Sequence, residues 1–185
     1  QYGARLAPVS LASEAKSCFR EEEGKMIAIG SDHGGFALKQ KVIAHLREKG
    51  MEVKDFGTDS TASCDYPDFG RLAAQAVASG ACEKGIVICT TGIGISITAN
   101  KVPGIRCALC HDSTSARLTR EHNDANVLAL GAGMIGENVA MDIVDTFFST
   151  PFSEGERHIR RIEKIREAER DALACGMGEK YQNKA

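Results

Sequence analysis

The stretch CTTGIGIS, from Cys89 to Ser96, joins a thiol to a glycine-rich turn directly after the apolar run GIVI. A glycine-rich turn between a strand and a helix exposes backbone N–H groups, which can bind a phosphate or a developing oxyanion. A cysteine at the start of such a turn can act as a nucleophile or a general base, because the positive end of a helix lowers the pKa of a thiol. The same cysteine could equally be a small buried core residue, and the loop a tight turn that packs well.

Neither common nucleotide-binding motif is complete in this loop. Gly92 and Gly94 are followed by Ile97 where the dinucleotide fingerprint requires a third glycine, and the P-loop pattern G-x-x-x-x-G-K-[ST] is absent. A nucleotide site is therefore disfavoured, and the N–H groups of the turn suit an oxyanion as well as a phosphate. Thr91 adds a hydroxyl that could donate to a carbonyl oxygen or relay a proton.

The segment SDHGG carries a carboxylate and an imidazole, Asp32 and His33, directly after the apolar run MIAIG. These two groups suit the recognition of sugar hydroxyls and the transfer of protons. A structural explanation also fits, in which Asp32 caps the following helix and His33 fills a turn. The segment REHNDAN adds His122 and Asn123 at the end of a polar helix, where His122 could simply match the helix dipole.

A basic stripe follows Pro151, because Arg157, Arg161 and Lys164 recur at helical spacing. Guanidinium groups bind phosphate through paired hydrogen bonds, so this stripe is a candidate phosphate clamp. A solvated face of a surface helix would show the same pattern.

Taken together, these groups are those needed to abstract a proton next to a carbonyl through an enediolate. They supply a base, an oxyanion hole, polar groups for sugar hydroxyls and a clamp for a remote phosphate. We expect no metal, since no cluster of histidines and carboxylates is apparent. The CALC segment, Cys107 to Cys110, lacks a second cysteine pair, and positions three apart on a strand point to opposite faces.

Short apolar runs alternate with amphipathic helical patterns along the chain. Strands are expected over 26–30, 51–57, 84–89, 105–110 and 125–131, and helices over 36–50, 68–80, 94–104, 111–124, 135–150 and 153–174. Strands that are apolar on both faces predict a doubly wound α/β fold with a parallel five-stranded sheet. Ser153 and Glu156 match the S-x-x-E capping box of the last helix. Ligands bind such folds beyond the carboxyl ends of the strands, where SDHGG and CTTGIGIS lie.

Length and composition indicate a single domain. We expect it at 26–170, after a disordered or tag-like extension at 1–25 and before a C-terminal tail at 171–185. The net charge of -2 gives no basic field for nucleic acid, and the apolar runs are too short to cross a membrane. Seven scattered cysteines, an odd number, favour reduced thiols and a cytoplasmic location.

Five blocks of the sequence together resemble the type B ribose-5-phosphate isomerases, a group that includes the galactose-6-phosphate isomerase subunits. The blocks are GSDHGGFALK, DYPDF, ICTTGIGISITANKVPGIRCAL, REHNDANVLALG and RHIRRIEKI, and they extend from about Met26 to Ile165. The resemblance implies a Rossmann-like three-layer α/β sandwich that binds a sugar phosphate without metal or other cofactor. It also implies a homodimer, or a dimer of dimers, whose active sites are built by both subunits.

The resemblance implies catalytic roles for four residues. Cys89 would be the base that moves a proton between C1 and C2, and Thr91 would help to stabilise the enediolate. Asp32 would hold sugar hydroxyls near the ring oxygen, and His122 would assist opening of the furanose ring.

The remaining implied positions bind the substrate. The N–H groups from Gly92 through Gly94 to Ser96 would face the enediolate, with Asn100 nearby. The phosphate would bind His33, Arg157 and Arg161, while Asn123 would contact the sugar and Tyr66 would form a pocket wall.

One departure is that many relatives carry an arginine where this chain has Gly133. The leading hypothesis is an aldose–ketose isomerase acting on D-ribose 5-phosphate in the non-oxidative branch of the pentose phosphate pathway. One alternative is a six-carbon substrate, galactose 6-phosphate or allose 6-phosphate. Another is a non-catalytic module that binds a sugar phosphate or a nucleotide.

Overall fold

Each apolar run that predicts a strand forms one in the computed structural model, which describes residues 26–175. The strands are β1 (Ile27–Ser31), β2 (Val53–Asp55), β3 (Lys84–Cys89), β4 (Cys107–Leu109) and β5 (Val127–Gly131). The helices are α1 (Phe36–Glu48), α2 (Tyr66–Ala78), α3 (Ile93–Ala99), α4 (Ser113–Asn123), α5 (Glu137–Ser149) and α6 (Glu156–Ala174). The alternation confirms the predicted α/β order.

The strands form one parallel sheet in the order β2-β1-β3-β5-β4. The three inner strands are buried along nearly their whole length, which explains why their sequences are continuously apolar. The two edge strands are shorter than predicted, since each pairs on one side only. The doubly wound, five-stranded parallel sheet is therefore confirmed.

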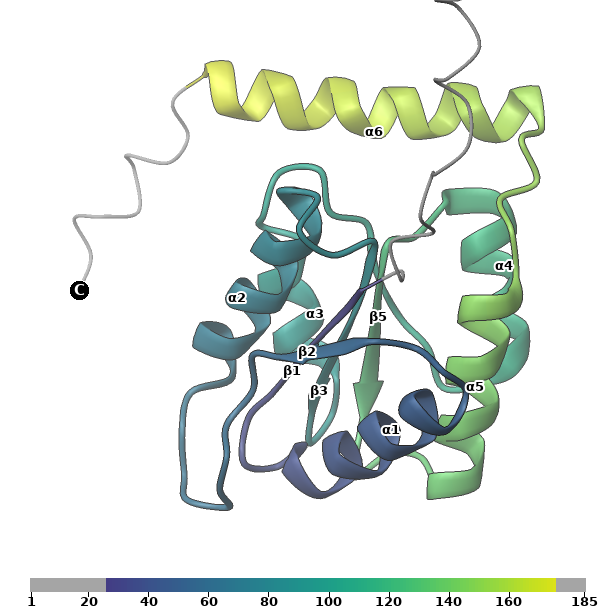
Figure 1. Cartoon of the computed structure of the whole chain (residues 1–185). Helices are drawn as coiled ribbons and strands as arrows, with labels where there is room; N and C mark the ends of the chain where they lie inside the picture. Colours follow the sequence, from purple (N-terminus) through teal and green to yellow (C-terminus); the bar gives the residue numbers. More distant parts are fainter. Residues whose placement is uncertain (1–25, 176–185) are drawn as a thin grey trace, which may run out of the picture.

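Helices cover both faces of the sheet and create two separate cores. On one face α2 and α3 pack against the strands, and on the other α1, α4 and α5 do so. Helix α6 packs on α4 and lies across the end of the sheet from which β5 begins (Figure 1). The sandwich thus has three layers, with α6 added outside them.

The boundaries of the last helix differ from the prediction. Helix α6 begins at Glu156 with Gly155 as its N-cap, and no side chain caps it, so the predicted capping box is wrong. Ser153 instead donates its hydroxyl to the carbonyl of Glu121, a contact that only the tertiary fold creates. The helix continues to Ala174, across the start predicted for the tail.

The predicted extension, 1–25, and the last part of the predicted tail lie outside the described residues. Within 26–175, no helix combines the length and apolar character needed to cross a bilayer.

Candidate active site

Asp32 and Cys89 lie side by side at the centre of the sheet. The register of β1 and β3 ends with Ser31 paired to Ile88, so Asp32, the first residue after β1, follows in line with Cys89, the last residue of β3. Neighbouring strands are about 5 Å apart, and paired residues of parallel strands point to the same face. Both side chains are buried, at 5% and 4% exposure, and Cys89 packs in the core beneath α2 and α3. The chain leaves β1 and β3 in opposite directions, and in doubly wound folds the ligand crevice lies at such a switch point.

The glycine turn after β3 is hydrogen-bonded to the Cys89 sulfur. The N–H of Gly92 donates to Cys89 Sγ at 3.1 Å, and Gly92 adopts a left-handed conformation with φ of 75°. A Cβ at this position would lie 2.8 Å from the carbonyl carbon of Leu130 and 2.9 Å from the nitrogen of Gly131. Only glycine therefore allows the turn to approach β5 and still present its N–H to the sulfur.

Replacing Gly92 by alanine should lower the free energy of unfolding by about 2–4 kcal/mol, because it combines a strained φ with a clash against backbone atoms. Chemical denaturation measured by circular dichroism would test this. Gly80 is a matched control, since its φ is 78° but a Cβ there meets nothing within 4 Å. Gly80→Ala should cost only the conformational strain, about 1–2 kcal/mol. Equal losses for the two variants would show that the close approach to β5 is unimportant.

The other N–H groups of the turn divide into occupied and free donors. Ile93 N–H donates to Thr91 Oγ1 at 3.2 Å, and Ser96 N–H donates to the carbonyl of Gly92 at 3.2 Å. Within residues 26–175, the N–H groups of Gly94 and Ile95 have no acceptor. Of the N–H groups from Gly92 to Ser96 that were expected to face the enediolate, only those of Gly94 and Ile95 are therefore free to bind a ligand. Thr91 uses its oxygen as an acceptor, so its hydroxyl proton can donate to a ligand.

The walls of the crevice come from α2 and from the loop after β1. Tyr66 packs its ring on Gly94, where a Cβ would lie 2.5 Å from Tyr66 Cζ. Gly34 lies against Thr90, so the loops after β1 and β3 are in contact. Ser96 is buried and donates its hydroxyl to the carbonyl of Ile93 at 2.8 Å, which commits this side chain to the helix.

Asp32 and His33 both make the turn-holding contacts of the structural explanation, and each keeps one polar atom without a partner among the described residues. Asp32 Oδ1 accepts the N–H of Gly35 at 2.9 Å and holds the turn, while Oδ2 has no protein partner among the described residues. His33 Nδ1 lies 3.2 Å from both the N–H and the carbonyl of Cys64. A ring without a proton on Nδ1 accepts from the first and a ring with a proton on Nδ1 donates to the second, so either form is anchored. In both forms Nε2 remains available for a ligand.

A second group of predicted residues gathers elsewhere. The ring of His122 lies 4.3 Å from that of His158, and His158 in turn contacts Arg157. Asn123 follows His122, and Arg161 is one helical turn beyond Arg157. The structure therefore brings together the end of α4 and the start of α6.

This second group is far from Cys89 within one chain. Helix α4 begins beside the carboxyl end of β4 and runs back along the sheet for 11 residues, a length of about 16 Å. His122 therefore lies near the amino ends of the strands, whereas Cys89 lies at the carboxyl end of β3. One chain does not bring His122, Asn123, Arg157 and Arg161 to the thiol.

Asn100 also belongs to the far end of the sheet. It follows α3, about 9 Å along the helix from Gly94. Its amide nitrogen donates to the carbonyls of Ser96 and Cys107, and its oxygen accepts the N–H of Cys107 at 2.8 Å. Within one chain the Asn100 side chain therefore joins α3 to β4. Asn100 is expected near the enediolate, and one chain does not place it there.

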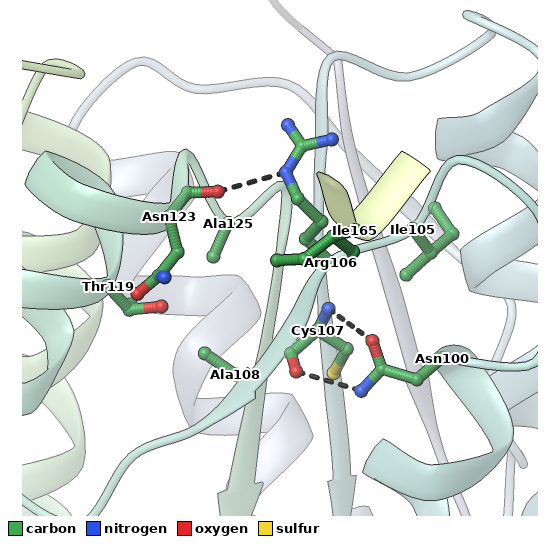
Figure 2. A pocket seen from close by; sticks show the side chains of 9 residues that line it. All are labelled: Asn100, Ile105, Arg106, Cys107, Ala108, Thr119, Asn123, Ala125 and Ile165. Carbon is green, nitrogen blue, oxygen red and sulfur yellow. Dashed lines mark hydrogen bonds between the residues drawn. The ribbon is translucent and has the colours of Figure 1, made fainter. Parts of the chain in front are cut away.

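Asn100 and Asn123 share a pocket of about 310 Å³ at this end. Figure 2 shows Asn123 with Thr119 on one side and Asn100, bound to Cys107, on the other. Arg106 lies between them and donates to the carbonyl of Asn123 at 2.9 Å. Of the second group of predicted residues only Asn123 lines this pocket, and neither Asp32 nor Cys89 does.

The cysteines of the CALC segment lie on opposite faces, as predicted. Cys107 packs with the core beneath α2 and α3, and Cys110 belongs to the core on the other face. Burial raises the pKa of both thiols, which keeps them protonated and unreactive. Among residues 26–175 there is no group of three or more histidine, cysteine or acidic side chains arranged to hold a metal.

Sequence reasoning missed the residues that position others. Cys64 anchors His33, Thr90 contacts the loop after β1, and Ser153 and His158 contact Arg157 through one hydrogen-bonded chain. None belongs to a periodic pattern, and most contacts join distant parts of the chain. Only the adjacency of His158 to the basic stripe was visible in the sequence.

The fold is a doubly wound parallel α/β sheet, and its central crevice carries a thiol, a buried carboxylate and free N–H donors. These features define the class of α/β proteins that bind a small ligand at the carboxyl ends of their strands. More specifically, the chain belongs to the ribose/galactose isomerase family, whose sequence model matches residues 27–165.

Named relatives agree with this assignment. Ribose-5-phosphate isomerase B of Escherichia coli is 50% identical over 141 residues, which cover 76% of this chain and 94% of that protein. The structure of ribose-5-phosphate isomerase B from Clostridium thermocellum is 56% identical, with a TM-score of 0.78 over 79% of this chain and 98% of that one. The type B enzyme of Trypanosoma brucei is 45% identical, with a TM-score of 0.76 over 78% of this chain and 99% of that one.

Proposed function

We propose that the protein is an aldose–ketose isomerase that interconverts D-ribose 5-phosphate and D-ribulose 5-phosphate. The register that sets the Cys89 thiol beside Asp32, next to the free N–H groups of Gly94 and Ile95, carries this proposal. The names of the Escherichia coli and Clostridium thermocellum relatives support the choice of substrate.

The proposed chemistry moves one carbon-bound proton. The Cys89 thiolate takes the proton from C2 of the open-chain aldose, and the C1 carbonyl oxygen becomes the oxyanion of an enediolate. The N–H groups of Gly94 and Ile95 and the hydroxyl of Thr91 stabilise that oxyanion. The thiol then returns its proton to C1, while the O2 hydroxyl loses its proton as C2 becomes the ketone. The proton from O2 ends on O1, with Thr91 as the relay.

We infer that a second copy of the chain completes each site. His122, Asn123, Arg157 and Arg161 suit ring opening and phosphate binding, but one chain holds them near the amino ends of the strands, because α4 runs about 16 Å back from the carboxyl end of β4. Helix α3 presents Ile93 and Ile97 beside the crevice at 52% and 56% exposure, an apolar surface suited to a partner. A homodimer with two shared sites satisfies both observations, and His33 then contributes to the phosphate site from the thiol side.

A six-carbon substrate is the second candidate, because the matched family is described as acting on ribose and galactose. Gly133 lies beside Thr90 at the edge of the crevice and has no side chain to limit its length. A non-catalytic sugar-phosphate module is the remaining alternative. We also propose that the protein acts in the non-oxidative branch of the pentose phosphate pathway, in the cytoplasm.

A comparison of substrates tests the proposal. Purified protein is expected to convert ribose 5-phosphate with a kcat/KM at least about tenfold above that for allose 6-phosphate or galactose 6-phosphate, as an extra hydroxymethylene group must be accommodated. Product formation would be followed by NMR in both directions. A preference for a six-carbon sugar would select the second candidate, and binding without turnover of any of them would select the non-catalytic module.

A further inference from the structure

His158 is a buried histidine whose two ring nitrogens are both engaged. Its exposure is 5%, although both neighbours in α6 are exposed. Nδ1 lies 2.8 Å from Ser153 Oγ, and Nε2 lies 3.0 Å from Arg157 Nε. The Ser153 hydroxyl also lies 2.6 Å from the carbonyl oxygen of Glu121. These four groups form one hydrogen-bonded chain from α4 to the guanidinium of Arg157.

Proton counting determines the direction of every bond in this chain. The carbonyl of Glu121 can only accept, so the single hydroxyl proton of Ser153 points to it. The oxygen of Ser153 must then accept from His158, which places a proton on Nδ1. Arg157 Nε–H can only donate, so Nε2 of His158 carries no proton. His158 is therefore a neutral ring in the Nδ1–H tautomer.

The surroundings favour this neutral form. Burial, and after it the neighbouring His122, Arg157 and Arg161, lower the pKa of His158 and outweigh a hydrogen bond with the backbone of Glu121, which raises it. His122 contributes from α4 and the two arginines from α6. A protonated ring would lose its acceptor for Arg157 and would repel the guanidinium.

Arg157 is held by this ring rather than by a carboxylate. Among the described residues, neither Arg157 nor Arg161 forms an ion pair, whereas Arg117 and Arg120 on α4 each pair with an acidic residue. With Nε held, the two terminal nitrogens of Arg157 have no hydrogen-bond partner among the described residues. Those nitrogens form the fork that binds a phosphate through paired hydrogen bonds.

We propose that His158 is a positioning residue that fixes the guanidinium of Arg157 for binding the phosphate of the substrate. Ser153 acts through it by determining the tautomer. The inference rests on the proposed function, in which Arg157 binds that phosphate. It adds the requirement that a neutral hydrogen-bond acceptor, Nε2 of His158, holds Nε of Arg157.

The tautomer can be tested in the wild-type protein without any assay of activity. Nitrogen-15 NMR of the histidine rings should show a protonated Nδ1 and an unprotonated Nε2 for His158 at neutral pH. A ring protonated on Nε2, or on both nitrogens, would overturn the inference even if the enzyme proves active.

The consequence for phosphate binding is tested with variants of the full chain. His158→Phe keeps the ring volume but removes the acceptor, and should raise KM for ribose 5-phosphate and the inhibition constant of inorganic phosphate about tenfold. The value of kcat should stay within about threefold, because the proton transfer lies elsewhere. His158→Gln, whose amide oxygen can accept from Arg157, should restore most of the affinity. His45→Phe is the control, since His45 is a half-buried histidine paired with Asp145 on the other side of α5. This variant should change neither the affinity for phosphate nor kcat.

A double-mutant cycle separates this inference from the proposed function. In an Arg157→Ala background, which itself weakens phosphate binding, His158→Phe should have no further effect. An undiminished effect there, or phosphate affinity unchanged in His158→Phe, would overturn the positioning role while leaving isomerase activity intact. An Arg157→Ala protein with normal phosphate affinity would overturn both the clamp and the inference. Absence of any wild-type isomerisation would reject only the proposed function, since phosphate affinity can be measured by calorimetry.

Discussion

Replacing Cys89 by alanine should lower kcat for ribose 5-phosphate by about a thousandfold, the usual contribution of a positioned general base. The side chain is buried and touches the turn through Gly92 N–H, and its removal leaves the other groups of the crevice in place. KM should change little, because sugar hydroxyls and phosphate are bound by other residues. Steady-state kinetics, together with calorimetric binding of ribose 5-phosphate to the variant, would measure both quantities.

Cys82→Ala is the matched control for this result. Cys82 is also a buried thiol, 2% exposed, in the same core beneath α2 and α3, but it lies at the opposite end of β3. Burial raises the pKa of its thiol, as expected of a structural cysteine. Its replacement should leave kcat nearly unchanged. Full activity of Cys89→Ala would show that another group is the base, whereas equal losses in both variants would indicate a general effect on the core.

Mixing two inactive variants should restore activity if each site is shared between two chains. A Cys89→Ala chain keeps His122, and a His122→Ala chain keeps Cys89, so a hybrid dimer contains one intact site and one doubly damaged site. Random exchange of subunits makes about half of the dimers hybrid, which gives about a quarter of wild-type activity. The variants would be mixed after mild dissociation and assayed with ribose 5-phosphate.

The choice of partners makes this experiment specific. Asp32 and Cys89 lie in the same half of the site by register, so Cys89→Ala mixed with Asp32→Ala should give no intact site and no recovery. Recovery of activity in both mixtures would mean that one chain merely stabilises the other, and it would not be evidence of a shared site. Recovery in neither, with dimers confirmed by light scattering, would mean that His122 does not serve the neighbouring thiol.

Much of the fold follows from local patterns. The inner strands β1, β3 and β5 are buried on both faces, so their apolar runs were recognisable without any partner. The edge strands β2 and β4 were overextended in the prediction, because the length of an edge strand depends on how much of it the neighbouring strand pairs. The start of α6 was misplaced for a related reason, since Ser153 bonds Glu121 and His158 instead of capping the helix.

The candidate site shows the same division. Cys89 and Asp32 were recognised because Cys89 ends a buried strand and Asp32 directly follows one, positions that the sequence makes evident. The partners of His33 and Arg157, by contrast, were not predictable. Cys64 is 31 residues from His33 in sequence, and the contact between them depends on where a long loop packs.

By itself, the sequence determined which residues end the strands, which turn supplies N–H donors and which family motifs are present. Periodicity and local hydrogen bonding are encoded within a few residues, so these features needed no three-dimensional information. Only the tertiary structure decided that β1 lies beside β3, which brings Asp32 to Cys89. It also decided that α4 carries His122 to the far end of the sheet, because strand order and helix direction arise from packing between segments distant in the chain.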